Sequence, residues 1–146
     1  MKSGGGDHRG SIFRLLVGSA LLNDKDSSFV CTTWDIKKPT QEMRRSEHSI
    51  EQAVTRIIGA MPFLWLEVND DAGPDNRRKI IERQSIALLS NFAKPPLDRP
   101  STKWRGLSCD HGECLVRGSG LWNQDYVDES YDPAFLDVME ALIERG

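Results

Sequence analysis

The chain has 146 residues, of which 38% are hydrophobic and 28% are charged, with a formal net charge of −3. This length fits one domain, and the composition is that of a globular protein, which excludes a disordered chain. The longest apolar runs are far too short to span a bilayer, and the polar first residues do not resemble a secretory signal. Three cysteines without dense spacing favour a reducing compartment, so we expect a cytoplasmic protein.

The charge is spread unevenly along the chain. Residues 121–146 carry seven acidic side chains and one arginine, a net charge of −6, so residues 1–120 carry a net charge of +3. A mildly basic body with an acidic tail permits a nucleic-acid surface without requiring one.

The first half of the chain reads mainly as helix. Residues 1–10 are rich in glycine and are expected to be a flexible N-terminal segment, His8 included. Ser11 is placed to cap a helix that runs to about Leu22. Residues 23–41 read as a loop with a short extended piece at 29–34. A second helix is predicted to begin at Thr40 or Ser46 and to end before Pro62.

The second half contains the one well-marked strand signal. Residues 63–68 (FLWLEV) are short, aromatic-rich and apolar, and read as a buried strand. A helix is predicted over residues 78–92, with Pro74 and Asp75 suited to its start. The segment 93–120 reads as irregular, with a short helix over 113–117, and a last helix is expected to start at Asp132 as N-cap and Pro133.

These elements predict an α/β (α+β) fold over residues 11–146 as a single domain. One or two strands cannot satisfy their own backbone groups, so we expect a mostly helical chain around a small, incomplete antiparallel sheet. The open edge of that sheet would favour low stability, homo-oligomer formation or pairing with a partner chain.

Glu82 is the most informative single residue of the predicted helix over 78–92. It recurs with Ile86 and Leu89 at i, i+4 and i+7, so the pattern places it in line with core residues. A carboxylate there needs a partner. One candidate is a divalent cation of the kind that stabilises a phosphoryl transition state. The other is an intrahelical ion pair with Arg78 or Lys79, and spacing alone favours this ion pair.

Two weaker patterns remain open. Cys109, His111 and Cys114, with Cys31, supply zinc-type ligands, but their spacing matches no strong template and ordinary loop positions are favoured. Several basic residues interleaved with acids are candidate phosphate contacts. These nucleic-acid-binding candidates are Arg9, Arg78, Arg83, Lys103 and Arg105.

The order of several ungapped segments resembles a bacterial protein related to the GIY-YIG nucleases. The segments are residues 8–15 (HRGSIFRL), 31–34 (CTTW), 58–66 (IGAMPFLWL), 81–91 (IERQSIALLSN), 119–123 (SGLWN) and 131–137 (YDPAFLD). The resemblance implies a small α/β domain that hydrolyses phosphodiester bonds in DNA with Mg²⁺ or Mn²⁺. It implies that Glu82 is the metal-binding and catalytic glutamate, and that Asn91 matches the asparagine that follows it.

The chain also departs from that family. It contains neither Gly-Ile-Tyr nor Tyr-Ile-Gly, and its only tyrosines are Tyr126 and Tyr131. The hairpin that carries the family's paired tyrosines would lie upstream of Gly4, so we expect a truncated or degenerate endonuclease domain that is inactive or very weak by itself. A nucleic-acid-binding or protein-interaction module without enzymatic activity is the alternative.

Overall fold

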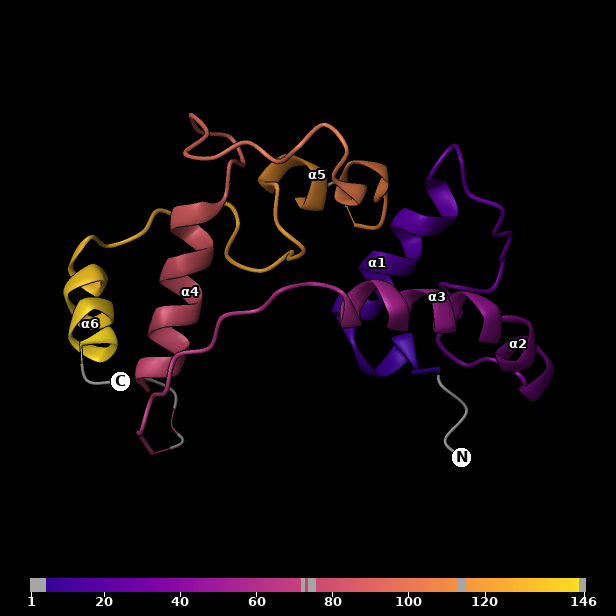
Figure 1. Ribbon diagram of the computed structural model, residues 1–146, viewed down its shortest axis with the longest axis horizontal. Helices are drawn as coiled ribbons and strands as arrows, with labels where there is room; N and C mark the ends of the chain where they lie inside the picture. The colour runs from indigo at the N-terminus through magenta and orange to yellow at the C-terminus, as the bar shows by residue number, and fades with distance from the viewer. Residues whose placement is uncertain (1–4, 72, 74–75, 113–114, 145–146) are drawn as a thin grey trace.

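The computed structural model describes residues 5–71, 73, 76–112 and 115–144. Within these ranges the regular elements are all helical (Figure 1). In chain order they are η1 (His8–Gly10), α1 (Ile12–Asn23), α2 (Gln41–Ser46), α3 (His48–Gly59), α4 (Arg77–Leu89), η2 (Arg105–Ser108), α5 (Leu115–Ser119) and α6 (Ala134–Ile143).

Helix α1 begins where the sequence predicts, because Ser11 is its N-cap. The Ser11 side chain accepts a hydrogen bond from the backbone N–H of Arg14 at 3.4 Å, which satisfies one of the free donors of the first turn. All six residues from 16 to 21 are buried, so α1 packs on more than one face. Ile12, the first residue of α1, is by contrast 54% exposed.

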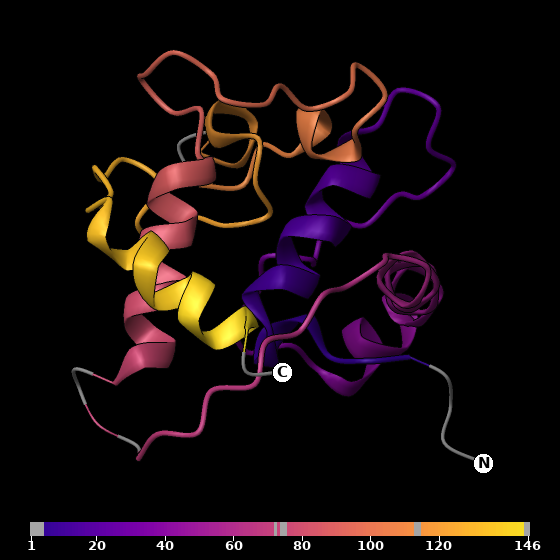
Figure 2. The ribbon, with the colours of Figure 1, turned by 60° about the vertical axis from the view of Figure 1, so that its left-hand side comes forward.

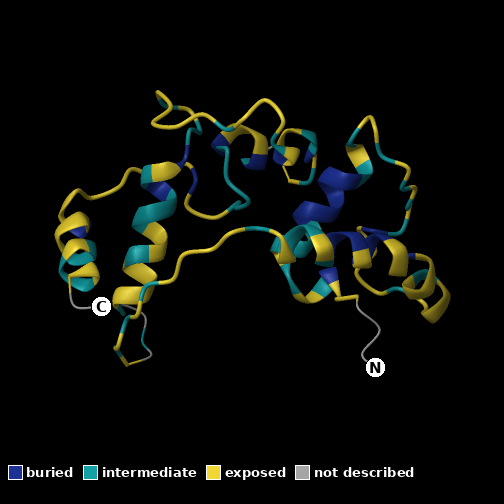
Figure 3. Ribbon diagram, viewed as in Figure 1, coloured by how far each residue is buried: buried dark blue, intermediate teal, exposed yellow. Residues whose placement is uncertain are grey.

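The hydrophobic core lies on two sides of α1. One cluster joins α1 to α3 around the indole of Trp34, and the other joins α1 to the segment that holds η2 and α5. The first cluster consists of Val17, Leu21, Trp34, Ile50, Ala53 and Val54. The second consists of Leu16, Ala20, Cys109 and Val116. Burial is therefore concentrated in and around α1 (Figure 3).

Helices α4 and α6 form the other side of the molecule. They contact each other and lie side by side in both ribbon views (Figures 1 and 2). Ala87 is the one buried residue that α4 contributes, while Ile80 and Leu89 are 41% and 48% exposed. This pair of helices therefore has a much thinner core than the helices around α1.

The predicted sheet is absent, and the α/β (α+β) prediction is wrong for the residues that the structure describes. Residues 62–71 run as an extended segment that links the two sides of the molecule (Figure 1). Phe63, Leu64 and Trp65 in this segment are 84%, 101% and 78% exposed, and no described segment pairs with them. Residues 29–34 form no strand either. The physical reason is that a strand exists only by pairing, and an apolar sequence supplies no partner.

Other predictions differ in their boundaries. The helix expected up to residue 60 is divided into α2 and α3, with Thr40 as the N-cap of α2. Asp132 was predicted as the N-cap of α6, but Pro133 is the N-cap, and the Asp132 carboxylate one residue earlier accepts the N–H of Ala134 at 3.0 Å. Pro74, Asp75, Glu113 and Cys114, which carried other predictions, lie outside the described residues. In the described part of the chain, no helix has the length and hydrophobicity needed to cross a membrane.

Candidate functional site

Glu82 lies on the exposed side of α4. The sequence pattern placed it in line with buried residues, and this prediction is wrong because Leu89, two turns further along that line, is itself 48% exposed. Among the described elements, α6 is the helix that packs on α4, so much of the predicted apolar face stays in solvent. The Glu82 carboxylate is therefore open to solvent, and its position does not demand a protein partner.

The intrahelical ion pair expected as the ordinary alternative does not form. Arg78 instead donates from Nε to Asp70 Oδ1 at 3.0 Å, and Arg83 pairs with Glu129. No described residue forms a hydrogen bond or ion pair with the Glu82 side chain. The two arginines next to it on α4 are thus bound to other carboxylates, which leaves Glu82 available to an incoming cation or donor.

The predicted nucleic-acid contacts share a feature that the sequence did not reveal. Four of the five are arginines, and each is paired with a carboxylate in the structure. Lys103 is exposed and forms no ion pair with any residue that the structure describes. The four pairs are Arg9–Glu47, Arg78–Asp70, Arg83–Glu129 and Arg105–Asp24. The candidates are spread over η1, α4, η2 and the turn before η2, so they do not belong to one element.

Asn91 lies just after the C-terminus of α4, apart from Glu82. Its Nδ2 donates to the Asp98 carbonyl at 2.7 Å, and its backbone N–H donates to the Ser119 carbonyl at 2.9 Å. These bonds fasten the segment after α4 to the end of α5. The Oδ1 atom of Asn91 is buried and accepts no hydrogen bond from any residue that the structure describes. An unpartnered buried carbonyl is costly, so this oxygen is a candidate acceptor for a bound group.

A second polar cluster lies between η1 and α3, and it centres on His8. The imidazole is 1% exposed and stacks on Trp34 with 3.7 Å between ring centroids. Its Nδ1 lies 2.8 Å from Glu51 Oε1, and its Nε2 lies 2.6 Å from the Trp34 carbonyl oxygen. The Glu51 carboxylate and the Trp34 carbonyl are both hydrogen-bond acceptors, and together they hold the imidazole at its two ring nitrogens. The expected flexible histidine is thus a buried one.

Two arginines complete this cluster. Arg9 forms a bidentate ion pair with Glu47, at 2.7 and 2.9 Å. Arg14 donates from Nε to Glu51 Oε2 at 3.2 Å and from Nη2 to the same oxygen. Burial raises the pKa of Glu51, but the hydrogen bonds from Arg14 and His8 outweigh it and hold that pKa below the ordinary value. Burial also opposes ionisation of Glu47, yet hydrogen bonds from Arg9 and Thr33 lower its pKa below the ordinary value.

The sequence contained one signal for this cluster. Glu47, Glu51 and Val54 recur at i, i+4 and i+7, so both carboxylates lie on the buried stripe of the α3 region. The same reasoning applied to Glu82 failed, because α4 is not covered on that side. Glu51 and Glu82 lie in equivalent helical patterns, and tertiary packing decided that only Glu51 is buried.

The His8 cluster is a poor metal site. Asp7, His8 and Glu51 hold ligand atoms within 4.8 Å of one another, the one such group found among the described residues. Both His8 nitrogens and both Glu51 oxygens are already used by protein partners. A cation there would also face Arg9 and Arg14, so the donor set suits an ion-pair network.

The zinc alternative gains no support in the described part of the chain. Cys109 is fully buried beside α1, and its neighbour His111 pairs with Asp35 at 3.2 Å. Cys114 is not among the described residues, and no described group of three ligands includes either Cys109 or His111. Cys109 is therefore a core residue.

A protein-family model described as the GIY-YIG domain matches residues 1–146. The match covers the complete sequence given, and it confirms the resemblance stated from the residues. No curated protein and no solved structure showed significant similarity to this chain.

Proposed function

We propose, from the premise that this chain belongs to the GIY-YIG domain family, that it is a DNA endonuclease domain in which Glu82 holds a divalent cation. The observation that carries this proposal is the state of Glu82: an exposed carboxylate, unpaired among the described residues, on a helix whose two nearest arginines are bound elsewhere. A surface carboxylate with basic neighbours ordinarily pairs with one of them.

The donor chemistry of Glu82 suits Mg²⁺ or Mn²⁺. Mg²⁺ keeps several waters and is commonly bound by one or two carboxylates together with substrate phosphates. A lone exposed carboxylate fits that requirement, whereas the enclosed His8 cluster does not. The cation, when bound, supplies charge stabilisation to a phosphoryl group. Glu82 would supply one oxygen ligand, and waters and substrate phosphates would supply the others.

Hydrolysis by these 146 residues alone is proposed to be weak or absent. The chain has neither of the tyrosine motifs that name the family, and its two tyrosines lie in the segment before α6. One carboxylate cannot by itself activate a water and align it with the scissile bond. Binding of DNA and of the cation is therefore expected to be easier to detect than cleavage.

A plasmid-nicking assay with Mg²⁺ or Mn²⁺, run on the wild type and on Glu82→Ala, tests this proposal. Mn²⁺ binding is measured in parallel by electron paramagnetic resonance, with and without DNA. Loss of Mn²⁺ binding in Glu82→Ala is the expected result, whether or not the wild type cleaves. Equal Mn²⁺ binding by the two proteins contradicts the role of Glu82. Glu42→Ala, an exposed glutamate on α2, is the matched control.

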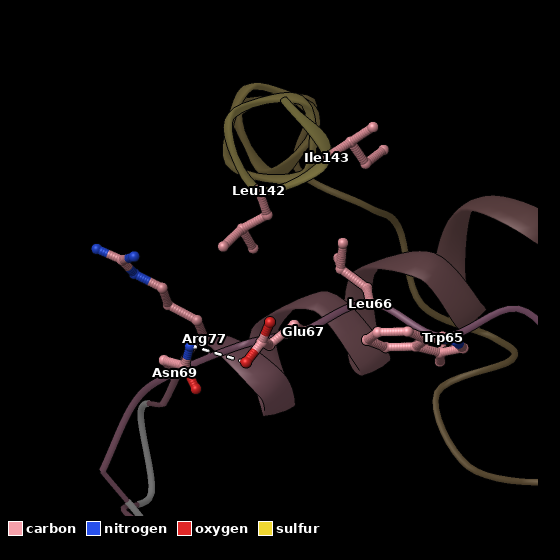
Figure 4. Close-up of a pocket in the computed structure, with 7 residues that line it drawn as sticks. All are labelled: Trp65, Leu66, Glu67, Asn69, Arg77, Leu142 and Ile143. Atoms are coloured by element: carbon pink, nitrogen blue, oxygen red, sulfur yellow. Dashed lines mark hydrogen bonds between the residues drawn. The ribbon is translucent and has the colours of Figure 1, made fainter. Parts of the chain in front are cut away.

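A second function is favoured by the extended segment over residues 62–69. Its apolar side chains are exposed, and together with the end of α6 it borders a cavity of about 440 Å³ (Figure 4). The lining residues are Trp65, Leu66, Glu67, Asn69, Arg77, Leu142 and Ile143. An extended segment with unpaired backbone groups is suited to pairing with another strand, so the second candidate is a protein-interaction module.

Sedimentation velocity over a dilution series tests this second function. The wild type is expected to associate at high concentration, and Leu64→Lys to remain monomeric, because the lysine places a charge in the apolar segment. Val30→Lys is the control, since Val30 is also 92% exposed but lies outside the segment. A wild type that stays monomeric at every concentration argues against self-association through residues 62–69.

A further inference from the structure

The segment before α6 carries a residue in an unusual backbone conformation. Tyr126 has φ of 60°, in the left-handed region that a bulky side chain rarely adopts. The residue is 41% exposed, so burial in the core does not offset the strain. The Glu129 N–H closes a turn onto the Tyr126 carbonyl at 3.3 Å, so these two side chains leave the same short turn.

Both side chains reach one guanidinium on α4. Glu129 accepts from Arg83 Nε at 2.6 Å and from Nη2 at 3.0 Å, a bidentate pair that fixes the guanidinium plane. The Arg83 Cζ atom lies 5.5 Å from the centre of the Tyr126 ring. The hydrogen bond and charge of Glu129 raise the pKa of Arg83 above its ordinary value.

The contacts leave one part of Arg83 unused. No described residue accepts a hydrogen bond from Nη1, and the side chain is 55% exposed. The Glu129 carboxylate and the Tyr126 ring fix the guanidinium, and Nη1 still has hydrogens to donate. Such a group is pre-organised, because its side-chain entropy is already lost before a ligand binds. Arg83 is also the residue that follows Glu82 on α4.

We propose that Arg83 is a substrate-phosphate contact and that Glu129 and Tyr126 are the positioning residues that aim its free edge. This inference rests on the proposed nuclease function and deepens it by assigning a phosphate contact beside Glu82. The segment also carries the exposed carboxylates Asp125 and Asp128. These carboxylates repel a nearby phosphate, so a favourable contact with Arg83 depends on a directional hydrogen bond.

If DNA binding depends on the orientation of Arg83, loss of the Glu129 charge changes DNA affinity in the direction opposite to that expected from net charge alone. Glu129→Gln removes a negative charge from the DNA-facing region, which by electrostatics alone tightens DNA binding. If Glu129 positions Arg83, the same substitution weakens binding by about fivefold, since a charge-assisted bidentate pair is lost. Asp24→Asn makes the matched change beside Arg105, an exposed arginine on η2, and is expected to bind equally well or more tightly.

The experiment is fluorescence anisotropy with a labelled duplex at several salt concentrations, in Ca²⁺ to prevent cleavage. Weaker binding by Glu129→Gln and by Tyr126→Ala, with tighter or unchanged binding by Asp24→Asn, supports the assignment. Equal or tighter binding by Glu129→Gln overturns it while leaving the nuclease proposal intact. A wild type that binds no duplex overturns both.

Tyr126→Gly separates a positioning role from a structural one. Glycine adopts positive φ without strain, so this variant is expected to keep or raise the thermal midpoint while it weakens DNA binding. A lower thermal midpoint with unchanged DNA affinity would show that the ring only stabilises the fold, and would overturn the role of Tyr126. Because the thermal midpoint and the DNA affinity are measured on the same variant, a loss of stability is distinguished from a loss of DNA binding.

Discussion

His8 lies stacked on Trp34, with 3.7 Å between ring centroids and an interplanar angle of 19°. The same imidazole hydrogen-bonds to the Trp34 backbone carbonyl and to Glu51 on α3. The indole Nε1 in turn donates to the Leu15 carbonyl on α1 at 3.1 Å. This chain of contacts joins η1, the loop over 29–34, α1 and α3, so removal of either ring is expected to loosen all four.

Replacement of His8 by alanine is expected to destabilise the protein by about 2–4 kcal/mol, because it leaves a buried carboxylate with one fewer partner and opens a cavity against Trp34. Urea unfolding followed by tryptophan fluorescence measures the change. His48→Ala is the control, since His48 is exposed on α3. Equal unfolding midpoints for the two variants would refute the structural role of His8.

Gly18 lies beneath the same indole. A Cβ atom placed there would collide with Trp34 Cζ2, and Trp34 is 3% exposed and stacked against His8, so the indole cannot easily move away. Gly18→Ala is therefore expected to cost about 1–3 kcal/mol of unfolding free energy through overpacking. Gly59→Ala, at the end of α3 with open space around it, is expected to be neutral or slightly stabilising. The opposite order of thermal midpoints would rule out this packing.

Stability is expected to fall in acid because of Glu47 and Glu51. Hydrogen bonds from Arg9 and Arg14 outweigh the effect of burial, so the pKa of each carboxyl is lower in the folded chain than its ordinary value of 4.5. The folded state binds fewer protons, so this stabilisation is complete above pH 4.5 and is lost as the pH falls through the folded pKa values. Urea midpoints measured from neutral pH down to about pH 3 test this. Glu51→Gln should flatten the dependence.

Glu82→Ala is expected to leave stability unchanged. The side chain is exposed and unpaired among the described residues, so its removal takes away no contact that the structure shows. Thermal unfolding of Glu82→Ala and Glu51→Ala side by side provides the comparison, and a large loss is expected only for the buried glutamate. A marked loss for Glu82→Ala would mean that this carboxylate is structural, which would weaken the metal proposal.

Cys109 is expected to react slowly with thiol reagents. Burial raises the pKa of its thiol above the ordinary value, and the side chain is fully enclosed. Iodoacetamide labelling followed by peptide mass spectrometry should show Cys109 modified at least about tenfold more slowly than the partly exposed Cys31. Urea should remove the difference. Rapid labelling of Cys109 in the native protein would contradict its place in the core.

The sequence by itself determined the local elements and the family. Ser11 predicted the start of α1 through its capping hydroxyl, and the apolar period of residues 50–61 predicted a helix, because both signals act between near neighbours. The ungapped segments carried the GIY-YIG resemblance, which the family comparison confirmed. The pattern of α4 singled out Glu82 as a carboxylate in need of a partner, whereas Asn91 was a candidate only through the resemblance.

Tertiary structure decided what was buried and what was paired. Residues 63–68 have a strand sequence but remain extended and exposed, because a strand requires a second segment for its hydrogen bonds. Glu51 and Glu82 have the same helical pattern, yet only Glu51 is buried, since α1 covers α3 and nothing in the described chain covers that side of α4. Pairing of Arg83 with Glu129 spans 46 positions, and no local pattern encodes a contact between residues so far apart in sequence.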